Sequence, residues 1–412
     1  MSAAPVLHAF AGYGIELEYM IVDRDTLSVR PVADELLRRA AGAGVAELKR
    51  GRLCWSNELV MHLIELKNAS PDPGLESLSA EFQSEVGYIN RLLEPLGARL
   101  MPTAMHPRMN PLAETRLWPH DDAVIYRTYD RIFGCKGHGW ANLQSMQLNL
   151  PFAGNAEFAR LHAAIRLVLP ILPALAASSP IAEGRPAGFL DFRMETYRTN
   201  QAKIPSTIER VIPNTVSSRA EYQATIMAPM YREIAPYDPD GVLRHEWLNV
   251  RGASPRFDRK AIEVRVLDMQ ECPQADLAIA AAVTAVVRTL YDAEWPPLPM
   301  QQAIGTDHLV SVLHACTRDA ELAVIDDAGY LRLLGFPDPL CKAGELWRHL
   351  IETTSLGGSA HWHEPLRVML DRGPLARRIL RAVGPGCSKT RLHAVYRELC
   401  DCLAEGRMFV DG

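Results

Sequence analysis

Residues 14–19 read Gly14-Ile15-Glu16-Leu17-Glu18-Tyr19, within an apolar, β-prone run over residues 13–22 that predicts a strand. Side chains alternate between the two faces of a strand, so Glu16 and Glu18 share one face and the apolar residues beside them share the other. The two carboxylates then lie about 7 Å apart and repel each other. A solvated edge strand explains this pair. So does a cation over that face, because Mg²⁺ binds through one or two carboxylates plus substrate phosphates.

The composition is that of an ordinary globular protein, with 412 residues of which 48% are hydrophobic and 23% charged. A chain of this length buries a large core and suggests two or more domains. The formal net charge of −5 comes without a basic stripe, which argues against nucleic acid as a partner.

We expect a cytoplasmic protein that does not engage a membrane. Residues 1–10 lack the basic and apolar regions of a signal peptide. Residues 163–177 are the most apolar stretch, but they are too few to span a bilayer and include Arg166 and two prolines. The eight cysteines contain no Cys-x-x-Cys pair, which indicates reduced thiols and not a disulfide framework or a zinc site.

A second acidic segment follows at residues 58–67. Residues 63–66 are strand-like and carry Glu65 among apolar neighbours, where a buried carboxylate is costly unless it is paired or bound to a metal. Glu58 lies just upstream, and a solvated loop explains it equally well.

Two later segments alternate as cleanly as the first. One places Gln147 and Asn149 on the same face of a predicted strand, and the other does so with Glu263 and Arg265. A half-solvated antiparallel strand explains either segment. The functional interpretation is that these side chains face the same site as the glutamates.

Arginines gather in and after the turn-rich loop over residues 178–189, which contains Arg185 and is followed by Arg193. Arginine suits bidentate recognition of phosphate and carboxylate, although arginines on surface loops are common. Residues 200–241 show little periodicity, as expected of a lid or binding loop. Beyond residue 274 the pattern becomes helical and predicts a helical C-terminal part packed on the sheet.

Predicted strands with polar residues on a common face thus recur along the chain. In this pattern and in its motifs the chain resembles glutamate–cysteine ligase family 2, the carboxylate–amine ligases related to glutamine synthetase. The matching motifs are GIELEY, ELVMHLIEL, MHP, ASSPIAEGRPAGF and IEVRVLD, spread over residues 12–275. The EGRPAGF motif with Arg193, and the amides of Gln147 and Asn149, are similar to the plant and proteobacterial enzymes. The opening glutamates look more like the bacterial carboxylate–amine ligase pattern.

The resemblance implies an α+β fold, with a mainly antiparallel, curved sheet, helices outside it and the catalytic architecture of glutamine synthetase. It implies a catalytic sheet domain over residues 1–275 and a helical part over residues 276–412. It also implies a site that uses ATP and more than one Mg²⁺.

Roles for individual side chains follow from the same resemblance. The implied metal ligands are Glu16, Glu18, Glu58, Glu65, Gln147 and Glu263. The implied ATP-phosphate contacts are Asn149, Arg185 and Arg265, and the implied catalytic residues are Glu16, Arg185 and Arg265. The implied contacts to the substrate α-carboxylate are Arg193, Arg127 and Arg251.

The implied reaction is ATP-dependent formation of an amide through an acyl phosphate, with glutamate and cysteine as the expected substrates. All partners are then small molecules, and a homo-oligomer is compatible with the sequence. Three alternatives stay open: a ligase for another acid or amine, a catalytically silent nucleotide-binding relative, and a metal-dependent hydrolase. The base that deprotonates the amine is not identified by the sequence.

Overall fold

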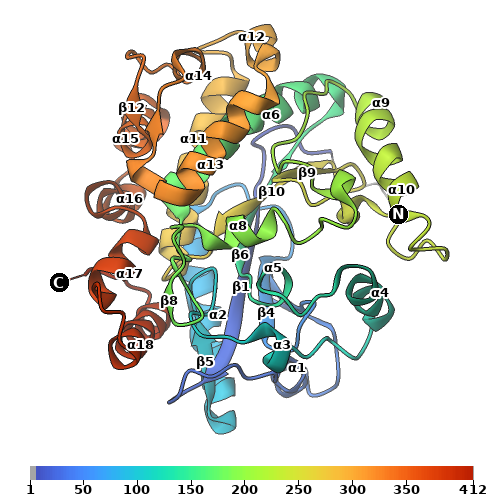
Figure 1. Cartoon of the computed structure of the whole chain (residues 1–412), viewed down its shortest axis with the longest axis vertical. Coiled ribbons are helices and arrows are strands. Elements are labelled where there is room, and N and C mark those ends of the chain that lie inside the picture. The colour runs from blue at the N-terminus through green and yellow to red at the C-terminus, as the bar shows by residue number, and fades with distance from the viewer. Residues whose placement is uncertain (1–5, 412) are drawn as a thin grey trace.

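The computed structural model describes residues 6–411, and its centre is one eight-stranded sheet (Figure 1). The strands of this sheet are β1 (Gly14–Asp23), β2 (Glu47–Arg50), β3 (Leu53–Asn57), β4 (Leu63–Asn68), β5 (Ala98–Met101), β6 (Ser145–Pro151), β9 (Ala253–Arg256) and β10 (Ala261–Asp268). They are arranged in the order β2-β3-β4-β1-β6-β10-β9, and β5 also pairs with β1. Every pairing is antiparallel, which confirms the predicted α+β class with a mainly antiparallel sheet.

Strand β1 sets the register of the sheet because it has three partners. Its first half pairs with β6, its middle with β4 and its end with β5. Ile15, Leu17 and Tyr19 are fully buried on its apolar face. A slip of one residue would exchange these side chains for Glu16 and Glu18 and would lose about 1.5–3 kcal/mol for each large apolar side chain.

Three long helices share the apolar core with that face of the sheet: α2 (Glu76–Leu93), α6 (Gly154–Val168) and α11 (Pro273–Tyr291). Helix α2 contributes Phe82 and Val86, one helical turn apart and both fully buried. Helix α11 packs on both α2 and α6. The other face of β1 is polar at Glu16 and Glu18, whereas Met20 and Val22 farther along it join a second apolar cluster with C-terminal residues such as Leu392 and Leu399.

The remaining helices surround this core (Figure 1), and those that precede β10 lie in the connections between its strands. They are α1 (Ala33–Ala41), α3 (Pro111–Glu114), α4 (Ala123–Phe133), α5 (His138–Ala141), α7 (Leu172–Ala176), α8 (Phe192–Tyr197), α9 (Arg219–Tyr222), α10 (Ala228–Ile234), α12 (Leu298–Ala303), α13 (Thr306–Asp319), α14 (Ala328–Leu333), α15 (Ala343–Thr353), α16 (Ala360–Arg372), α17 (Leu375–Val383) and α18 (Lys389–Glu405).

The apolar helical stretch Gly154–Ala176 is long enough to cross a membrane by length and hydropathy alone. In this fold 94% of its apolar window is buried inside the protein, so it behaves as a core helix. Its length exceeds the predicted apolar stretch because α6 continues through a short 3₁₀ turn into α7.

The C-terminal part is helical, as predicted, with one short hairpin of β11 (Val324–Ile325) and β12 (Cys341–Lys342). Helix α18 returns to pack on β5 and α2, far from it in sequence (Figure 1). The domain division at residue 275 stays a prediction, since helices from both sides of it share one apolar core. The segment over residues 200–241 is less irregular than predicted, because α9 and α10 form within it.

Candidate active site

The polar side chains that were predicted to share a site, although they come from separate strands, lie on one face of the sheet. In the register, Glu18 is opposite Glu65, and Glu16 is opposite both Lys67 and Gln147. Directly opposed residues share a face, and the same logic carries the polar row through Asn149 to its partner Glu263. The predicted same-face arrangement is therefore present, while the roles of these side chains remain predictions.

Three carboxylates gather at the centre of this face. Oxygen atoms of Glu18, Glu58 and Glu65 all lie within 4.8 Å of one another. Glu18 is 9% exposed and Glu65 is 5% exposed, whereas Glu58 is half-buried after β3. The solvated-loop explanation for Glu58 does not hold, because the loop turns its carboxylate into the cluster. We call Glu18, Glu58 and Glu65 the carboxylate cluster.

Neighbouring donors fix the orientation of two cluster members. Glu18 accepts hydrogen bonds from the Ser145 amide at 2.7 Å, the Ser145 hydroxyl at 3.1 Å and the Gln147 side-chain amide at 3.0 Å. Glu65 accepts from the Ser56 hydroxyl at 2.7 Å and from the Lys67 ammonium at 2.7 Å. These contacts pre-organise the two carboxylates before any ligand arrives.

The electrostatics of the cluster disfavour three simultaneous negative charges. Burial raises the pKa of Glu18 to about 7, with a further contribution from the charge of Glu65, against the lowering effect of its hydrogen bonds and of Arg193. Burial and then the charge of Glu65 also raise the pKa of Glu16 and of Glu58 well above the ordinary value. Burial opposes ionisation of Glu65 too, but Lys67 together with hydrogen bonds from Ser56 and Glu16 outweighs it and holds the pKa of Glu65 below its ordinary value.

The donor set of the cluster fits a hard divalent cation. Carboxylate oxygens are the ligands that Mg²⁺ prefers, and the nearby amide of Gln147 adds a neutral oxygen that can turn toward the same centre. A dication would favour the ionised form of Glu18 and Glu58, against the burial and the repulsion from Glu65 that raise their pKa. Glu16 belongs to the rim of this site, since Asn149 donates to its carboxylate at 2.9 Å and Glu65 is its charged neighbour.

Glu263 lies on the same face but has cations of its own. Arg265 lies 3.0 Å from one carboxylate oxygen and Arg256 lies 3.6 Å from the other. Burial lowers the pKa of Arg265, but the charge of Glu263, together with Tyr197, Tyr129 and Glu18, outweighs it and raises this pKa above its ordinary value. Glu263 is thus neutralised within the protein, and its predicted role as a metal ligand is not tested by this geometry.

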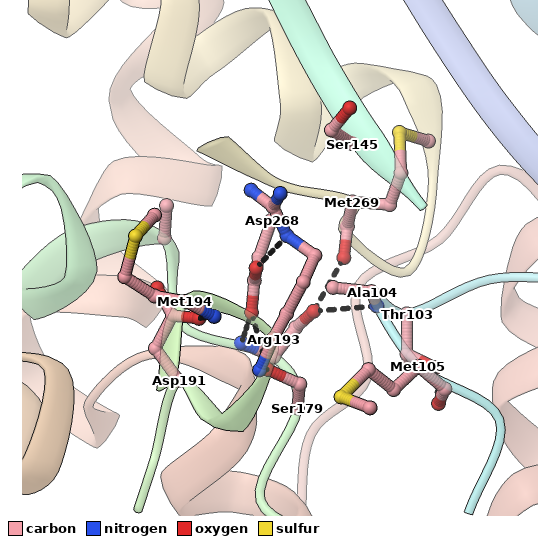
Figure 2. A network of polar contacts seen from close by, with 12 residues as sticks. Thr103, Ala104, Met105, Ser145, Ser179, Asp191, Arg193, Met194, Asp268 and Met269 are labelled. Atoms are coloured by element: carbon pink, nitrogen blue, oxygen red, sulfur yellow. Dashed lines mark hydrogen bonds and ion pairs between the residues drawn. The ribbon is translucent and has the colours of Figure 1, made fainter. Parts of the chain in front are cut away.

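A buried polar network closes the face at the far end of β10 (Figure 2). Asp268 accepts from Arg193 Nε at 2.6 Å and from the Ser179 hydroxyl and Ser178 amide, each at 2.8 Å. Asp191 caps α8 by accepting from the Met194 amide at 2.8 Å, which presents Arg193 from the first turn of the helix. No role was predicted for Asp268, because Ser178 and Ser179 reach it from a loop about 90 residues away and Arg193 reaches it from α8.

The four arginines outside the central strands that were predicted to bind ATP or substrate have different surroundings. Arg193 is 1% exposed and is bound to Asp268, but its charge still lowers the pKa of Glu18. Arg251 is equally buried and pairs with Glu209 at 3.0 Å. By contrast, Arg185 is exposed and pairs with Glu183 at 3.1 Å on a short hairpin of β7 (Ile181–Ala182) and β8 (Arg185–Pro186).

Arg127 is exposed on α4, away from the hydrogen bonds that organise the cluster. Of these four, Arg193 lowers the pKa of the cluster residue Glu18. The roles predicted for Arg127, Arg185, Arg193 and Arg251 in ATP or substrate binding stay predictions.

A cavity of about 800 Å³ opens beside the cluster, at the N-terminal end of β1. Glu16, Lys67 and Asn149 form its wall on the sheet side. Apolar, cationic and acidic residues complete the lining, among them Leu7, Lys49, Arg259, Lys260, Glu47 and Asp258. Neither this cavity nor the inward direction of Lys67 was predicted, although Lys67 follows Glu65 at the spacing that places both on one face.

Comparison with known proteins identifies relatives over nearly the whole chain. Residues 13–396 match the family described as glutamate–cysteine ligase family 2 (GCS2). An uncharacterized protein of Archaeoglobus fulgidus is 34% identical over 397 residues, which are 96% of this chain and 100% of that protein. The chloroplastic glutamate–cysteine ligase of Nicotiana tabacum is 26% identical over 46% of this chain and 36% of its own length.

A solved structure has the same fold. The glutamate–cysteine ligase of Francisella tularensis, crystallised in complex with AMP, superimposes with a TM-score of 0.59. The match covers 94% of this chain and 88% of that one at 13% sequence identity, so it is evidence about the fold alone.

Proposed function

This chain belongs to glutamate–cysteine ligase family 2 and is a carboxylate–amine ligase, and on that premise we propose that it uses ATP and Mg²⁺ to join glutamate to cysteine. The observation that carries the proposal is the carboxylate cluster on the sheet, adjacent to a cavity large enough for a nucleotide. A cavity of about 800 Å³ falls within the usual range of roughly 300–1,000 Å³ for small-molecule sites.

The cavity chemistry supports a nucleotide as its occupant. Its lining combines apolar surface that suits a base with the cations Lys49, Arg259 and Lys260, which suit phosphates, and the acids Glu47 and Asp258 lie among them. Glu16 separates this lining from the carboxylate cluster, so a triphosphate in the cavity would extend toward the cluster. The bound AMP of the Francisella tularensis relative is consistent with nucleotide use in this fold.

In this proposal Glu18, Glu58 and Glu65 hold the divalent cation, and Glu16 and Gln147 complete its surroundings. When bound, the cation neutralises phosphate charge during phosphoryl transfer. Asn149 lines the cavity, and Arg265, which pairs with Glu263 on the same face of the sheet, adds fixed positive charge.

The proposed chemistry proceeds in two steps. A γ-carboxylate oxygen of glutamate attacks the γ-phosphorus of ATP, the bond to the bridging oxygen breaks, and ADP leaves. The amino nitrogen of cysteine then attacks the acyl carbon, the C–O bond to phosphate breaks, and the amine loses a proton as the amide forms. The protein contributes positioning and charge stabilisation, and it must exclude water, which would otherwise hydrolyse the acyl phosphate.

The proposal is tested by measuring phosphate release from ATP across pairs of amino acids and identifying the products by mass. We expect release that requires glutamate, cysteine and Mg²⁺ together, with a product one water lighter than the sum of the two amino acids. Phosphate release with glutamate and a different amine would support the ligase activity and identify an amine substrate other than cysteine. ATP-independent turnover would contradict the ligase mechanism and favour a hydrolase.

Two further expectations belong to the same proposal. We propose a cytoplasmic enzyme that acts on small molecules, without nucleic acid or a membrane as partner. A homo-oligomer remains compatible with it, and light scattering of the purified full chain measures the molecular mass directly.

A further inference from the structure

Lys67 occupies an unusual place for a lysine. It lies on β4, two residues after Glu65 and directly opposite Glu16, so its side chain shares the polar face with both glutamates. Its side chain is only 27% exposed, so the ammonium loses much of its hydration. This loss is unfavourable unless nearby acids compensate the charge. Its charge lies at the boundary between the carboxylate cluster and the cavity.

The hydrogen bonds of Lys67 leave part of its donor capacity unused. An ammonium group has three N–H donors. One donates to Glu65 at 2.7 Å and one to the Ser56 hydroxyl at 3.0 Å. Two further acids are its neighbours: Glu16, which acts on the ammonium through its charge, and Glu47, which is 3.7 Å away and so beyond hydrogen-bond distance. Within residues 6–411 the ammonium therefore has one N–H donor without a hydrogen bond, and Lys67 lines the cavity.

We propose that Lys67 binds a phosphate oxygen of the nucleotide while its contacts to Glu65 and Ser56 hold the ammonium in place. This inference rests on the proposed ATP site and adds a residue to it. The ammonium serves two anions at once: the fixed carboxylate of Glu65 and the incoming phosphate. It also competes with divalent cations for Glu65 when no nucleotide is bound, because both bind the same carboxylate.

Removing the charge of Lys67 should weaken nucleotide binding and strengthen divalent-cation binding. Lys67→Met keeps the length of the side chain and removes the ammonium. Nucleotide affinity should fall by about ten- to a hundredfold, the range for loss of a hydrogen bond to a charged group. Affinity of the nucleotide-free protein for Mn²⁺ should rise, because the competing internal cation is gone. A lysine with only a structural role would not move these two affinities in opposite directions.

The experiment measures ADP binding by titration calorimetry and Mn²⁺ binding by electron paramagnetic resonance, with ADP titrated both in Mg²⁺ and in EDTA. Lys67→Arg should keep ADP affinity closer to wild type than Lys67→Met does, because it keeps the charge. Lys342→Met is the matched control, since Lys342 is an exposed lysine on β12. We expect both affinities of this control to equal those of the wild type.

A second comparison tests the same role if Lys67→Met unfolds the protein by leaving Glu65 unpaired. Glu65→Gln alone and Glu65→Gln with Lys67→Met differ only in the ammonium, without an unpaired carboxylate in either. The double variant should bind ADP in EDTA about ten- to a hundredfold more weakly than the single variant. Equal ADP affinity in these two variants, or in wild type and Lys67→Met, overturns the role of Lys67. Wild-type protein that binds ADP in neither buffer overturns the proposed function itself.

Discussion

The acidic side chains of β1 and β4 and those of β10 lie on the same face of one sheet, yet they are neutralised in different ways. On β10, Glu263 is flanked by Arg265 and Arg256, and Asp268 is paired with Arg193. In the carboxylate cluster, Lys67 is the cation that contacts Glu65 directly, and it is a single charge beside three acids.

This difference separates structural acids from candidate ligands. A buried carboxylate with its own arginine is electrostatically complete, and removal of either partner leaves an unpaired charge. A group of carboxylates with too few internal cations has raised pKa values, and a cation from solution relieves it. Burial alone does not distinguish the two regions, because Glu65 and Glu263 are both nearly inaccessible.

The largest effect should come from breaking a completed pair. In Asp268→Ala the guanidinium of Arg193 keeps its charge without a partner, in a site where both side chains are almost fully buried. We expect a loss of about 3–5 kcal/mol in the free energy of unfolding, measured by chemical denaturation. Asp371→Ala is the control, because its exposed pair with Arg348 should contribute less than about 1 kcal/mol. Equal losses in the two variants would contradict the comparison.

Glu65→Gln should have the opposite profile. The variant weakens the proposed cation site and should lower ATP turnover by about 10²-fold, as loss of one charge-stabilising group does in other enzymes. Its free energy of unfolding should change by no more than about 1 kcal/mol, because relief of repulsion from Glu18 and Glu58 offsets the lost ion pair with Lys67.

Coupled measurement of ADP release gives the turnover of this variant. Glu94→Gln, which removes an exposed charge paired with Arg24, is the matched control and should retain wild-type turnover. Normal turnover in Glu65→Gln would exclude this carboxylate as a metal ligand.

A third, smaller effect concerns the pH dependence of the free energy of unfolding. The raised pKa of Glu18, about 7, means that the folded protein retains this proton while the unfolded chain loses it near its ordinary pKa. Between these two values the folded state binds more protons, so the contribution of Glu18 to stability falls as pH rises, by about 1–3 kcal/mol in EDTA. Mg²⁺ should reduce this loss, because it favours the ionised carboxylate.

The quantity to measure is the difference in free energy of unfolding between wild type and Glu18→Gln, at pH 5 and at pH 7.5. This difference removes the contributions of other groups, such as His62, whose pKa burial lowers to about 4. A difference that is independent of pH in EDTA would show that Glu18 is ionised throughout.

The smallest effect on stability should come from Arg185→Ala. The Arg185 side chain is 76% exposed and its partner Glu183 is 60% exposed, so the free energy of unfolding should change by less than about 0.5 kcal/mol. The same variant tests the role that family resemblance implies for Arg185. A raised KM for ATP would support phosphate binding, and an unchanged KM would contradict it.

Much of the polar face was predictable from local sequence. The alternation in residues 13–22 is enough to place Glu16 and Glu18 on one face, and the later strands behave in the same way. The inward turn of Glu58 was not predictable, because a loop has no fixed side-chain period. Nor was the pairing of Asp268, whose partners reach it from another part of the chain.

The amino-acid sequence by itself determined which side chains of each strand face the same way, because the two-residue period of a strand is a local property of the backbone. Only the tertiary structure decided which acids receive an arginine, which gather without one, and where Lys67 points. Those outcomes depend on the register between strands distant in sequence. Charge compensation requires approach within a few ångströms, which only the assembled sheet provides.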